Sequence, residues 1–317
     1  MSADFFKALD LESPDEYLGV GSGSQAEQTA DGLVAIERLL EAREPEAVIA
    51  QGDTNAVLST AIGASKLPVE FGHIEAGIRS HDRSMPEEIN RTLADHVADL
   101  CFAPTTVAVE HLSAEGINDG VYETGNTIVD ACLEHHSIAE SESEILSEFQ
   151  LTAGEYAVAT IHRARNTDDC TRLRTILKAF DSQEFPVVFP CHPRSKTVID
   201  ALGFQPSGSL ILVDPLDYLD FLKLEANARL IVTDSGGVQE EASILGIPCL
   251  TVRPNTERPE TIQAGVNRLI EPMSVREAME ELFFDDDRHR EMQGAQTLYG
   301  DGTSAEKIVR IMEERYI

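Results

Sequence analysis

Three segments in the first half of the chain carry carboxylates in a pattern suited to acid–base chemistry. Asp53 follows one apolar run, Glu75 ends a second, and Glu87 begins a helical pattern just after Pro86. Carboxyl groups that share one edge of a sheet repel each other, which raises the pKa of at least one of them and lets the set act as acid and base. Taken singly, each also fits a helix cap or a solvated charge.

A second candidate site lies in residues 233–242, which read Thr-Asp-Ser-Gly-Gly-Val-Gln-Glu-Glu-Ala. An apolar run typical of a buried strand precedes this segment, and apolar residues at helical spacing follow it. Ser235, Gly236 and Gly237 would let the backbone approach a ligand, and the free N–H groups of the first helical turn bind anions. A carboxylate further along, Glu240 or Glu241, suits a ribose hydroxyl. The segment therefore favours a nucleoside diphosphate, and the alternative is a tight turn that binds nothing.

Donor and cationic side chains follow the other predicted strands of the second half. His162 and Arg163 follow one strand, His192 follows the next, and a loop containing Arg258 comes after a third. The carboxyl ends of parallel strands meet at one edge of a sheet, so these groups are expected near the predicted anion site. Surface loops rich in Pro and Arg are the alternative for any one of them.

The sequence predicts neither a metal site nor a nicotinamide cofactor. His73 and Glu75 have the spacing of the His-x-Glu pair in zinc deaminases, but no Pro-Cys-x-x-Cys follows. His135 and His136 are adjacent on a predicted helix, so their side chains face different directions. The chain contains no Gly-x-Gly-x-x-Gly fingerprint, no nucleophile elbow and no phosphate-loop lysine motif.

The composition describes an acidic protein with a substantial core. The chain has 317 residues, 42% of them hydrophobic, with 56 Asp and Glu against 25 Lys and Arg, for a net charge of −31. This charge repels nucleic acid and anionic lipid, and with only six Lys residues it indicates a protein that works at high salt. No apolar run is long enough to span a membrane, and the N-terminus lacks a signal-peptide pattern. Five dispersed cysteines favour reduced thiols in a cytoplasm.

Apolar runs alternate with amphipathic segments along the whole chain, which predicts parallel sheets covered by helices. The predicted strands are 47–50, 69–74, 100–103, 157–161, 187–190, 210–213, 230–233, 249–252 and 268–270. Predicted helices include 28–41, 54–65, 87–97, 173–180 and 275–282. The acidic, Ser-rich stretch 137–155 predicts a boundary between two α/β domains, 1–150 and 151–303. Ligands of such domains bind beyond the carboxyl ends of the strands, here in a cleft between two sheet edges.

Seven of these segments together resemble the non-hydrolysing UDP-N-acetylglucosamine 2-epimerases. They are Gln51-Gly-Asp-Thr54, His73-Ile-Glu-Ala-Gly-Ile-Arg79, Met85-Pro-Glu-Glu-Ile-Asn-Arg91, Thr124-Gly-Asn-Thr127, Ile161-His-Arg163, Asp234-Ser-Gly-Gly-Val-Gln-Glu-Glu-Ala242 and Asn255-Thr-Glu-Arg-Pro-Glu260. Their order is that of the family, and they span nearly the whole chain.

The resemblance implies a glycosyltransferase-B-like α/β fold, with two Rossmann-like domains, a central cleft and a C-terminal helix at 304–315 that returns to the first domain. It implies interconversion of UDP-N-acetylglucosamine and UDP-N-acetylmannosamine through a 2-acetamidoglucal intermediate, without a cofactor, in a cytoplasmic homodimer that serves polysaccharide synthesis. The residues that match the family's catalytic groups are Asp53, Glu75, Glu87 and His162. Those that match its UDP-binding groups are His192, Ser235, Gly236, Gly237, Glu241 and Arg258.

The chain departs from the family pattern in two places. Family members begin with a further strand, a Gly-x-Arg-Pro-Glu loop, a helix and a Gln-His segment, whereas this sequence starts after them. The first sheet is therefore expected to lack its first strands, and the nucleotide site to lack one Arg. The second departure is Arg165, which stands where the family usually has an acid.

Three other functions are open on the sequence alone. A relative can act on another UDP-sugar or hydrolyse UDP from the sugar, and a protein of this fold can bind a nucleotide sugar without turnover. A glycosyltransferase shares the architecture, but several carboxylates in the first half fit C–H chemistry on a sugar better.

Overall fold

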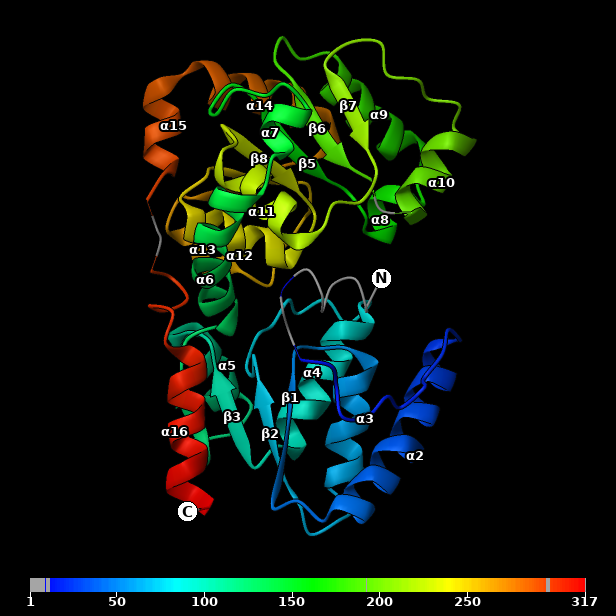
Figure 1. The fold of residues 1–317 in the computed structure, drawn as a ribbon, viewed down its shortest axis with the longest axis vertical. Helices are drawn as coiled ribbons and strands as arrows, with labels where there is room; N and C mark the ends of the chain where they lie inside the picture. The colour runs from blue at the N-terminus through cyan, green and yellow to red at the C-terminus, as the bar shows by residue number, and fades with distance from the viewer. Residues whose placement is uncertain (1–8, 10–11, 192, 295–296, 317) are drawn as a thin grey trace. The chain divides into compact units, whose positions relative to one another are not determined.

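The computed structural model describes residues 9, 12–191, 193–294 and 297–316. The chain forms two compact α/β units. We call residues 13–130, together with the stretch from Tyr299 onward, the N-terminal unit, and Ala131–Leu298 the C-terminal unit. Both contain a wholly parallel sheet, as the alternation of strands and helices predicts (Figure 1).

The N-terminal unit is built on a four-stranded sheet in the order β1-β2-β3-β4. Its strands are β1 (Ala47–Gln51), β2 (Glu70–Ile74), β3 (Leu100–Ala103) and β4 (Val121–Glu123). Its helices are α2 (Gln25–Arg43), α3 (Asn55–Ala64), α4 (Pro86–Val97), α5 (Thr106–Ala114) and α16 (Ser304–Tyr316), and α6 (Thr127–Glu142) begins in it. The predicted C-terminal helix at 304–315 corresponds to α16 (Figure 1). Its Ile308 packs with Leu100 and Phe102 of β3.

The C-terminal unit is built on a six-stranded sheet in the order β10-β9-β8-β5-β6-β7. Its strands are β5 (Ala157–Thr160), β6 (Val187–Pro190), β7 (Leu210–Val213), β8 (Leu230–Thr233), β9 (Cys249–Thr251) and β10 (Asn267–Leu269). Its helices are α7 (Ile145–Glu148), α8 (Ala164–Thr167), α9 (Cys170–Asp181), α10 (Pro193–Ala201), α11 (Tyr218–Ala226), α12 (Gly236–Leu245), α13 (Pro259–Gln263), η1 (Pro272–Ser274), α14 (Val275–Phe284) and α15 (Asp286–Met292).

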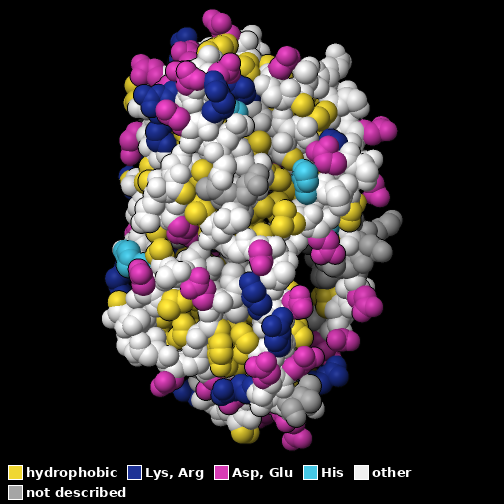
Figure 2. Space-filling model, turned by 90° about the vertical axis from the view of Figure 1, so that its left-hand side faces the viewer, with side chains coloured by type: hydrophobic (Ala, Val, Ile, Leu, Met, Phe, Trp, Pro, Cys, Tyr) yellow, Lys and Arg dark blue, Asp and Glu magenta, His cyan; other side chains and the backbone are white. Residues whose placement is uncertain are grey.

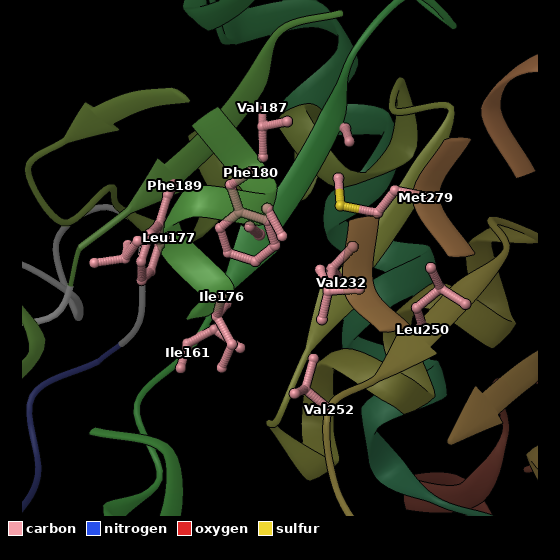
Figure 3. Packing of buried hydrophobic residues seen from close by; sticks show 14 of the residues in the cluster. Ile161, Ile176, Leu177, Phe180, Val187, Phe189, Val232, Leu250, Val252 and Met279 are labelled. Atoms are coloured by element: carbon pink, nitrogen blue, oxygen red, sulfur yellow. The ribbon is translucent and has the colours of Figure 1, made fainter. Parts of the chain in front are cut away.

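One face of the six-stranded sheet carries the largest hydrophobic core of the C-terminal unit. Apolar side chains of α9 and α14 pack against alternate residues of the central strands, as the parallel-sheet pattern requires (Figure 3). Phe180 of α9 meets Phe189 of β6 edge to face, with ring centroids 6.2 Å apart. This packing fixes the strand ends from which the polar side chains project.

The acidic stretch 137–155, which the sequence predicts as the domain boundary, does not contain the division between the two units. Residues up to Glu142 continue α6, and the division between the two units falls earlier in that helix, between Asp130 and Ala131. Glu140 pairs with Lys223 at 2.7 Å and the Ser143 hydroxyl donates to Asp220 at 2.6 Å, so the stretch is bound to α11. Polar side chains such as Glu140, which suggest a linker in the sequence, instead join α6 to α11.

Candidate functional site

The C-terminal sheet has a topological switch point between β5 and β8. From β5 the chain builds outward through β6 and β7, whereas β8 pairs with the other side of β5 and continues to β9 and β10. Ligands of open parallel sheets bind at the carboxyl ends of the strands where the order reverses. His162 follows β5 and Ser235 follows β8, and the strand ends are joined by a hydrogen bond between the Thr160 and Thr233 hydroxyls at 2.6 Å.

Asp234 orients His162 at this switch point. Its buried carboxylate accepts the backbone N–H of His162 at 3.0 Å and that of Arg163 at 3.1 Å, and lies 3.0 Å from His162 Nδ1. Burial alone would raise the pKa of Asp234, but the hydrogen bonds from His162 and Asn166 hold it below its usual range. The His162 side chain is 46% exposed. Because Nδ1 faces the carboxylate, Nε2 is the ring atom directed away from Asp234 and available to a ligand.

The first turn of α12 presents the predicted anion site. Ser235 is the N-cap residue, and its hydroxyl makes no capping hydrogen bond to the helix. The N–H groups of the first turn therefore have no side-chain cap and, with the positive end of the helix dipole, suit an anion. A Cβ at Gly236 would lie 2.7 Å from Glu257 Oε1, so any other residue there would require this carboxylate to shift.

A mostly apolar cavity of about 290 Å³ opens beside this turn and includes both His162 and Ser235 in its lining. The remaining lining residues are Thr160, Ile161, Phe189, Pro190, Pro215, Leu216, Phe221 and Val238. Sequence reasoning missed Phe221 and Leu216, because both read as ordinary apolar positions. Phe221 could have been found as an aromatic residue near the start of a helix that follows a parallel strand in the same predicted domain as the anion site.

Glu241, the predicted ribose ligand, lies in a buried cluster of acidic and phenolic groups. Burial raises its pKa to about 7, against a hydrogen bond with Tyr218 that lowers it. Glu225 of α11 is fully buried, and within the described residues neither of its carboxyl oxygens has a hydrogen-bond partner. Burial, together with the charge of Glu241, raises the pKa of Glu225 well above its usual range. Burial therefore disfavours the charged form of Glu225.

Arg258 and His192 are the remaining predicted UDP ligands, and the loop that contains Arg258 is held by buried ion pairs. Arg258 is buried and pairs with Glu240 at 2.7 Å, on the same helix as Glu241. His192 lies outside the described residues. Glu257 binds Arg253 at 2.6 Å and Arg163 at 3.0 Å, and these cations hold the pKa of this buried carboxyl well below its usual range although burial opposes them.

In the N-terminal unit, Asp53 follows β1 and is held on two sides. Its carboxylate forms an ion pair with the buried Arg91, and its backbone carbonyl accepts the amide of Asn90 at 2.9 Å. Arg91 also pairs with Glu88 at 3.2 Å. Sequence reasoning did not identify Arg91 as the partner of Asp53, although both lie in segments that it singled out.

Glu87 and Glu88, adjacent at the start of α4, have separate roles. Glu88 is buried and accepts the backbone N–H groups of Ser80 at 2.9 Å and His81 at 2.8 Å, which fixes the preceding loop. Glu87 is exposed and lines a cavity of about 500 Å³ together with Asp53. The structure thus brings two of the three predicted carboxylates of this unit to one cavity.

Glu75, the third carboxylate, lies just beyond β2 in a left-handed conformation with φ of +71°. Non-glycine residues rarely adopt this conformation, and it is concentrated at functional sites. Gln51, at the end of the neighbouring strand β1, donates its side-chain amide to Glu75 Oε1 at 2.9 Å. Glu75 is therefore positioned at the same sheet edge as Asp53.

Two further features of the described residues bear on the function. No group of three or more His, Cys, Asp or Glu side chains among them is arranged to hold a metal ion. In the same part of the chain, no helix is both long and apolar enough to cross a membrane.

The chain is similar to proteins of one enzyme family. The family model described as UDP-N-acetylglucosamine 2-epimerase matches residues 1–313. The UDP-N-acetylglucosamine 2-epimerase of Methanocaldococcus jannaschii is 41% identical, over 98% of this chain and 87% of that protein. A UDP-2,3-diacetamido-2,3-dideoxy-D-glucuronate 2-epimerase of Pseudomonas aeruginosa is 37% identical, with the same coverage.

Solved structures agree with the sequence comparison. The M. jannaschii enzyme in complex with UDP-GlcNAc and UDP superposes with a TM-score of 0.90 and covers 99% of this chain and 88% of its own. A sucrose-phosphate synthase of Thermosynechococcus elongatus, 12% identical, superposes over 96% of this chain and 81% of its own with a TM-score of 0.59, which extends the likeness to the glycosyltransferase-B-like fold. The predicted fold class is confirmed, and the chain belongs to the UDP-N-acetylglucosamine 2-epimerase family.

Proposed function

We propose that this protein is an isomerase that interconverts UDP-N-acetylglucosamine and UDP-N-acetylmannosamine. The observation that carries the proposal is the cavity lined by His162 and Ser235 at the switch point, next to the uncapped N-terminus of α12. Family membership and the carboxylates at the edge of the other sheet support the same reaction.

In this proposal the C-terminal unit binds the UDP group. The diphosphate lies at the first turn of α12, where Ser235, Gly236 and Gly237 provide backbone donors, and His162, the proposed catalytic histidine, lines the same cavity. The apolar lining, including Phe221, suits the face of a uracil ring. Ribose hydroxyls bind the Glu241 carboxylate.

Two further UDP ligands, Arg258 and His192, are assigned from their places in the C-terminal unit. Arg258 holds Glu240 and so fixes the helix that carries Glu241, which places a cation behind the nucleotide site. His192 follows β6, whose end contributes Phe189 and Pro190 to the cavity, and we assign it to the diphosphate on that basis.

The N-terminal unit supplies the groups that act on the sugar. The C1–O bond to UDP breaks with its electron pair leaving on the diphosphate, a carboxylate removes the C2 proton, and the C1–C2 double bond of 2-acetamidoglucal forms. A carboxyl on the other face then returns a proton to C2, and the diphosphate oxygen adds back to C1. Asp53, Glu75 and Glu87 are the acid and base candidates. Because no carbonyl adjoins C2, its proton is weakly acidic, and breakage of the C1–O bond runs ahead of proton removal. Hydrogen-bond donors that stabilise the departing diphosphate therefore account for much of the reduction in the activation barrier.

Deuterium exchange tests the proposed reaction. The protein is incubated with UDP-N-acetylglucosamine in deuterated buffer at high salt, and both the C2 position and the products are followed by NMR. We expect deuterium at C2 in both epimers. Binding of UDP without exchange would indicate a protein that binds nucleotide sugars without turnover, and free UDP with free N-acetylmannosamine would indicate a hydrolysing enzyme.

The P. aeruginosa relative makes a second substrate worth testing. Its name specifies a UDP-2,3-diacetamido-2,3-dideoxy-D-glucuronate, which differs from UDP-N-acetylglucosamine at C3 and C6. The same exchange experiment with that nucleotide sugar, compared by kcat/KM, assigns the preferred substrate.

Replacing Ser235 with Leu is expected to weaken UDP binding at least about tenfold, equivalent to about 1.4 kcal/mol. The larger side chain occupies the cavity beside the first turn of α12 and keeps the diphosphate from the backbone N–H groups. Isothermal titration with UDP measures the effect. Ser274→Leu is the matched control, because Ser274 is also an N-cap residue without a side-chain capping bond in the same unit. Equal UDP affinity in both variants would show that the turn does not bind the diphosphate.

We also propose that the protein works as a homodimer in a high-salt cytoplasm and serves polysaccharide synthesis. The net charge of −31 supports the salt requirement, and acidic side chains are scattered over the face shown in Figure 2. Size-exclusion chromatography with light scattering tests the dimer.

The melting temperature is expected to rise between about 0.1 M and 1 M KCl, because the Debye length falls from about 10 Å to 3 Å and self-repulsion is screened. Differential scanning calorimetry measures it, with glycerol of equal osmolality as the uncharged control. A melting temperature that is equal in both series at every concentration would contradict a role for screening.

A further inference from the structure

Three hydrogen bonds join the ends of β1 and β2, and we call them the strand-end latch. Gly52 donates its backbone N–H to the Ile74 carbonyl at 3.1 Å, and the Gln51 amide donates to Glu75 at 2.9 Å. The third links His73 Nε2 to the Gly52 carbonyl at 2.8 Å. This latch holds the two turns that present Asp53 and Glu75.

Both turns have a left-handed backbone conformation, and the one at Glu75 needs support. Gly52, next to Asp53, has φ of +84°, and Glu75 has φ of +71°. The left-handed conformation is free of penalty for glycine but costs about 1 kcal/mol or more for a residue with a side chain. Contacts that over-determine the position are therefore required at Glu75, and the latch provides them.

The hydrogen bonds of His73 require a proton on both ring nitrogens. The Gly52 carbonyl can only accept, so Nε2 carries a hydrogen. Nδ1 lies 2.6 Å from Asp95 Oδ1, and the other oxygen of Asp95 already accepts Arg79 at 2.7 Å and the Gly77 N–H at 3.0 Å. An ionised Asp95 also only accepts, so Nδ1 carries a hydrogen as well. The ring is therefore an imidazolium.

The ion pairs around the ring agree with a charged His73. His73 and Asp95 are fully buried, and Arg79 is 1% exposed and pairs with both Asp95 and Glu115. Two cations then face two carboxylates, the buried Asp95 and Glu115, which lies at the surface. The other titratable groups that act on this cluster are Glu75 beyond β2, Asp99 before β3, Cys101 on β3 and His96 on α4.

The pKa values agree with this charge assignment. Burial alone would lower the pKa of His73, but the hydrogen bond and charge of Asp95 raise it above its usual range. Burial would likewise raise the pKa of Asp95, yet His73 and Arg79 hold it below its usual range.

We propose that His73 is a positioning residue for the epimerase reaction, an imidazolium that fixes the Gly52 carbonyl and thereby the placement of Asp53 and Glu75. This inference rests on the proposed function for its catalytic consequence. The charge state itself is a property of the resting protein.

Two substitutions separate the halves of the ring. In His73→Gln the side-chain amide nitrogen takes the place of Nε2, so the hydrogen bond to the Gly52 carbonyl is kept and the one to Asp95 is lost. In His73→Asn the amide nitrogen takes the place of Nδ1, so the hydrogen bond to Asp95 is kept and the one to the Gly52 carbonyl is lost. We expect kcat to fall at least about tenfold further in the Asn variant than in the Gln variant, with similar KM and similar losses of melting temperature. UDP affinity is expected to be unchanged in both, because the UDP groups lie in the C-terminal unit.

His81→Asn is the control, since His81 is exposed and has φ of +57°, which Asn tolerates. Equal kcat values for His73→Asn and His73→Gln, or activities that simply follow melting temperature, would overturn the positioning role.

The wild-type protein provides a test that needs no variant to fold. Long-range ¹H–¹⁵N spectra of ¹⁵N-histidine-labelled protein at pH 8 are expected to contain one ring with both nitrogens protonated. If every histidine ring is neutral at pH 8, the inference is wrong even if the enzyme is active. If that ring is charged but no C2 exchange occurs with any substrate, the proposed function fails instead.

Discussion

Replacing Glu75 with Gln is expected to reduce exchange of the C2 proton by about 10²–10⁴-fold, the range that a positioned acid or base contributes. The change removes the ionisable group and little else. The amide oxygen introduced by Glu75→Gln can still accept the Gln51 amide, so the strand-end latch and the left-handed backbone are kept. UDP affinity is expected to stay within about twofold, because the groups proposed to bind UDP belong to the C-terminal unit and Glu75 to the N-terminal unit.

Two measurements decide this prediction. Deuterium incorporation at C2 reports the chemical step, and isothermal titration with UDP reports nucleotide binding. Glu110→Gln is the control, since Glu110 is an exposed carboxylate of the same unit on α5. Exchange that persists at the wild-type rate would remove Glu75 from the mechanism, and a parallel loss of UDP affinity would indicate a folding defect.

The strands were predicted closely because parallel strands buried on both faces read as short apolar runs. Every predicted strand is found with ends within one residue of the observed ones. β4 (Val121–Glu123) was missed, since a three-residue strand with one charged member gives no run to detect. Its register with β3 comes from tertiary pairing.

Helix ends depended on capping chemistry that the apolar pattern does not contain. The helix predicted from residue 28 begins at Gln25, because Ser24 and Glu27 form a capping box in which each side chain accepts the backbone N–H of the other. The Ser-x-x-Glu signature is visible in the sequence and would have corrected the prediction. The docking of residues 137–142 on α11 had no such local signal.

The candidate site was predictable where the groups follow strand ends and unpredictable where partners come from elsewhere. Strand order places His162 beside Ser235, and the family motifs point to both. The ion pair of Asp53 with Arg91 and the burial of Glu225 beside Glu241 depend on side-chain packing across elements. A Glu in the apolar face of a helix reads in a sequence as a solvated charge, which is the wrong interpretation for Glu225.

Replacing Glu225 with Met is expected to stabilise the protein at neutral pH by several kcal/mol. A buried carboxyl without a hydrogen-bond partner costs free energy, and a thioether of similar size fills the same space without that cost. Glu225 lies on α11 among apolar neighbours such as Leu224 and Ala228, which pack in the core beneath α12. The variant should also be more resistant to urea, with an unchanged m value.

The pH dependence identifies the cause of that gain. The pKa of Glu225 is raised in the folded protein, so its contribution to stability is fully present below the unfolded value near 4.5 and is lost as pH rises toward the folded value. The advantage of the Met variant is therefore expected to be smallest near pH 4.5 and to grow by about 1.4 kcal/mol for each pH unit until the pH reaches the folded pKa. The pKa of Glu241 is raised to about 7, so Glu241 also makes both proteins less stable as pH rises. Its contribution does not cancel completely when the two free energies of unfolding are subtracted, because the charge of Glu241 acts on Glu225 in the wild type only.

Urea unfolding of the wild type and variants from pH 5 to pH 8 measures this slope. Glu225→Gln separates ionisation from polarity, since it should flatten the pH dependence like Met while gaining less stability, because its amide stays buried. Glu277→Met on α14 is the control for an exposed carboxylate and should change little. Parallel pH profiles for the wild type and Glu225→Met would mean that Glu225 is ionised and solvated in the folded protein. A slope that is smaller in both Glu225 variants than in the wild type would show that ionisation of this one buried carboxyl makes the protein less stable as pH rises.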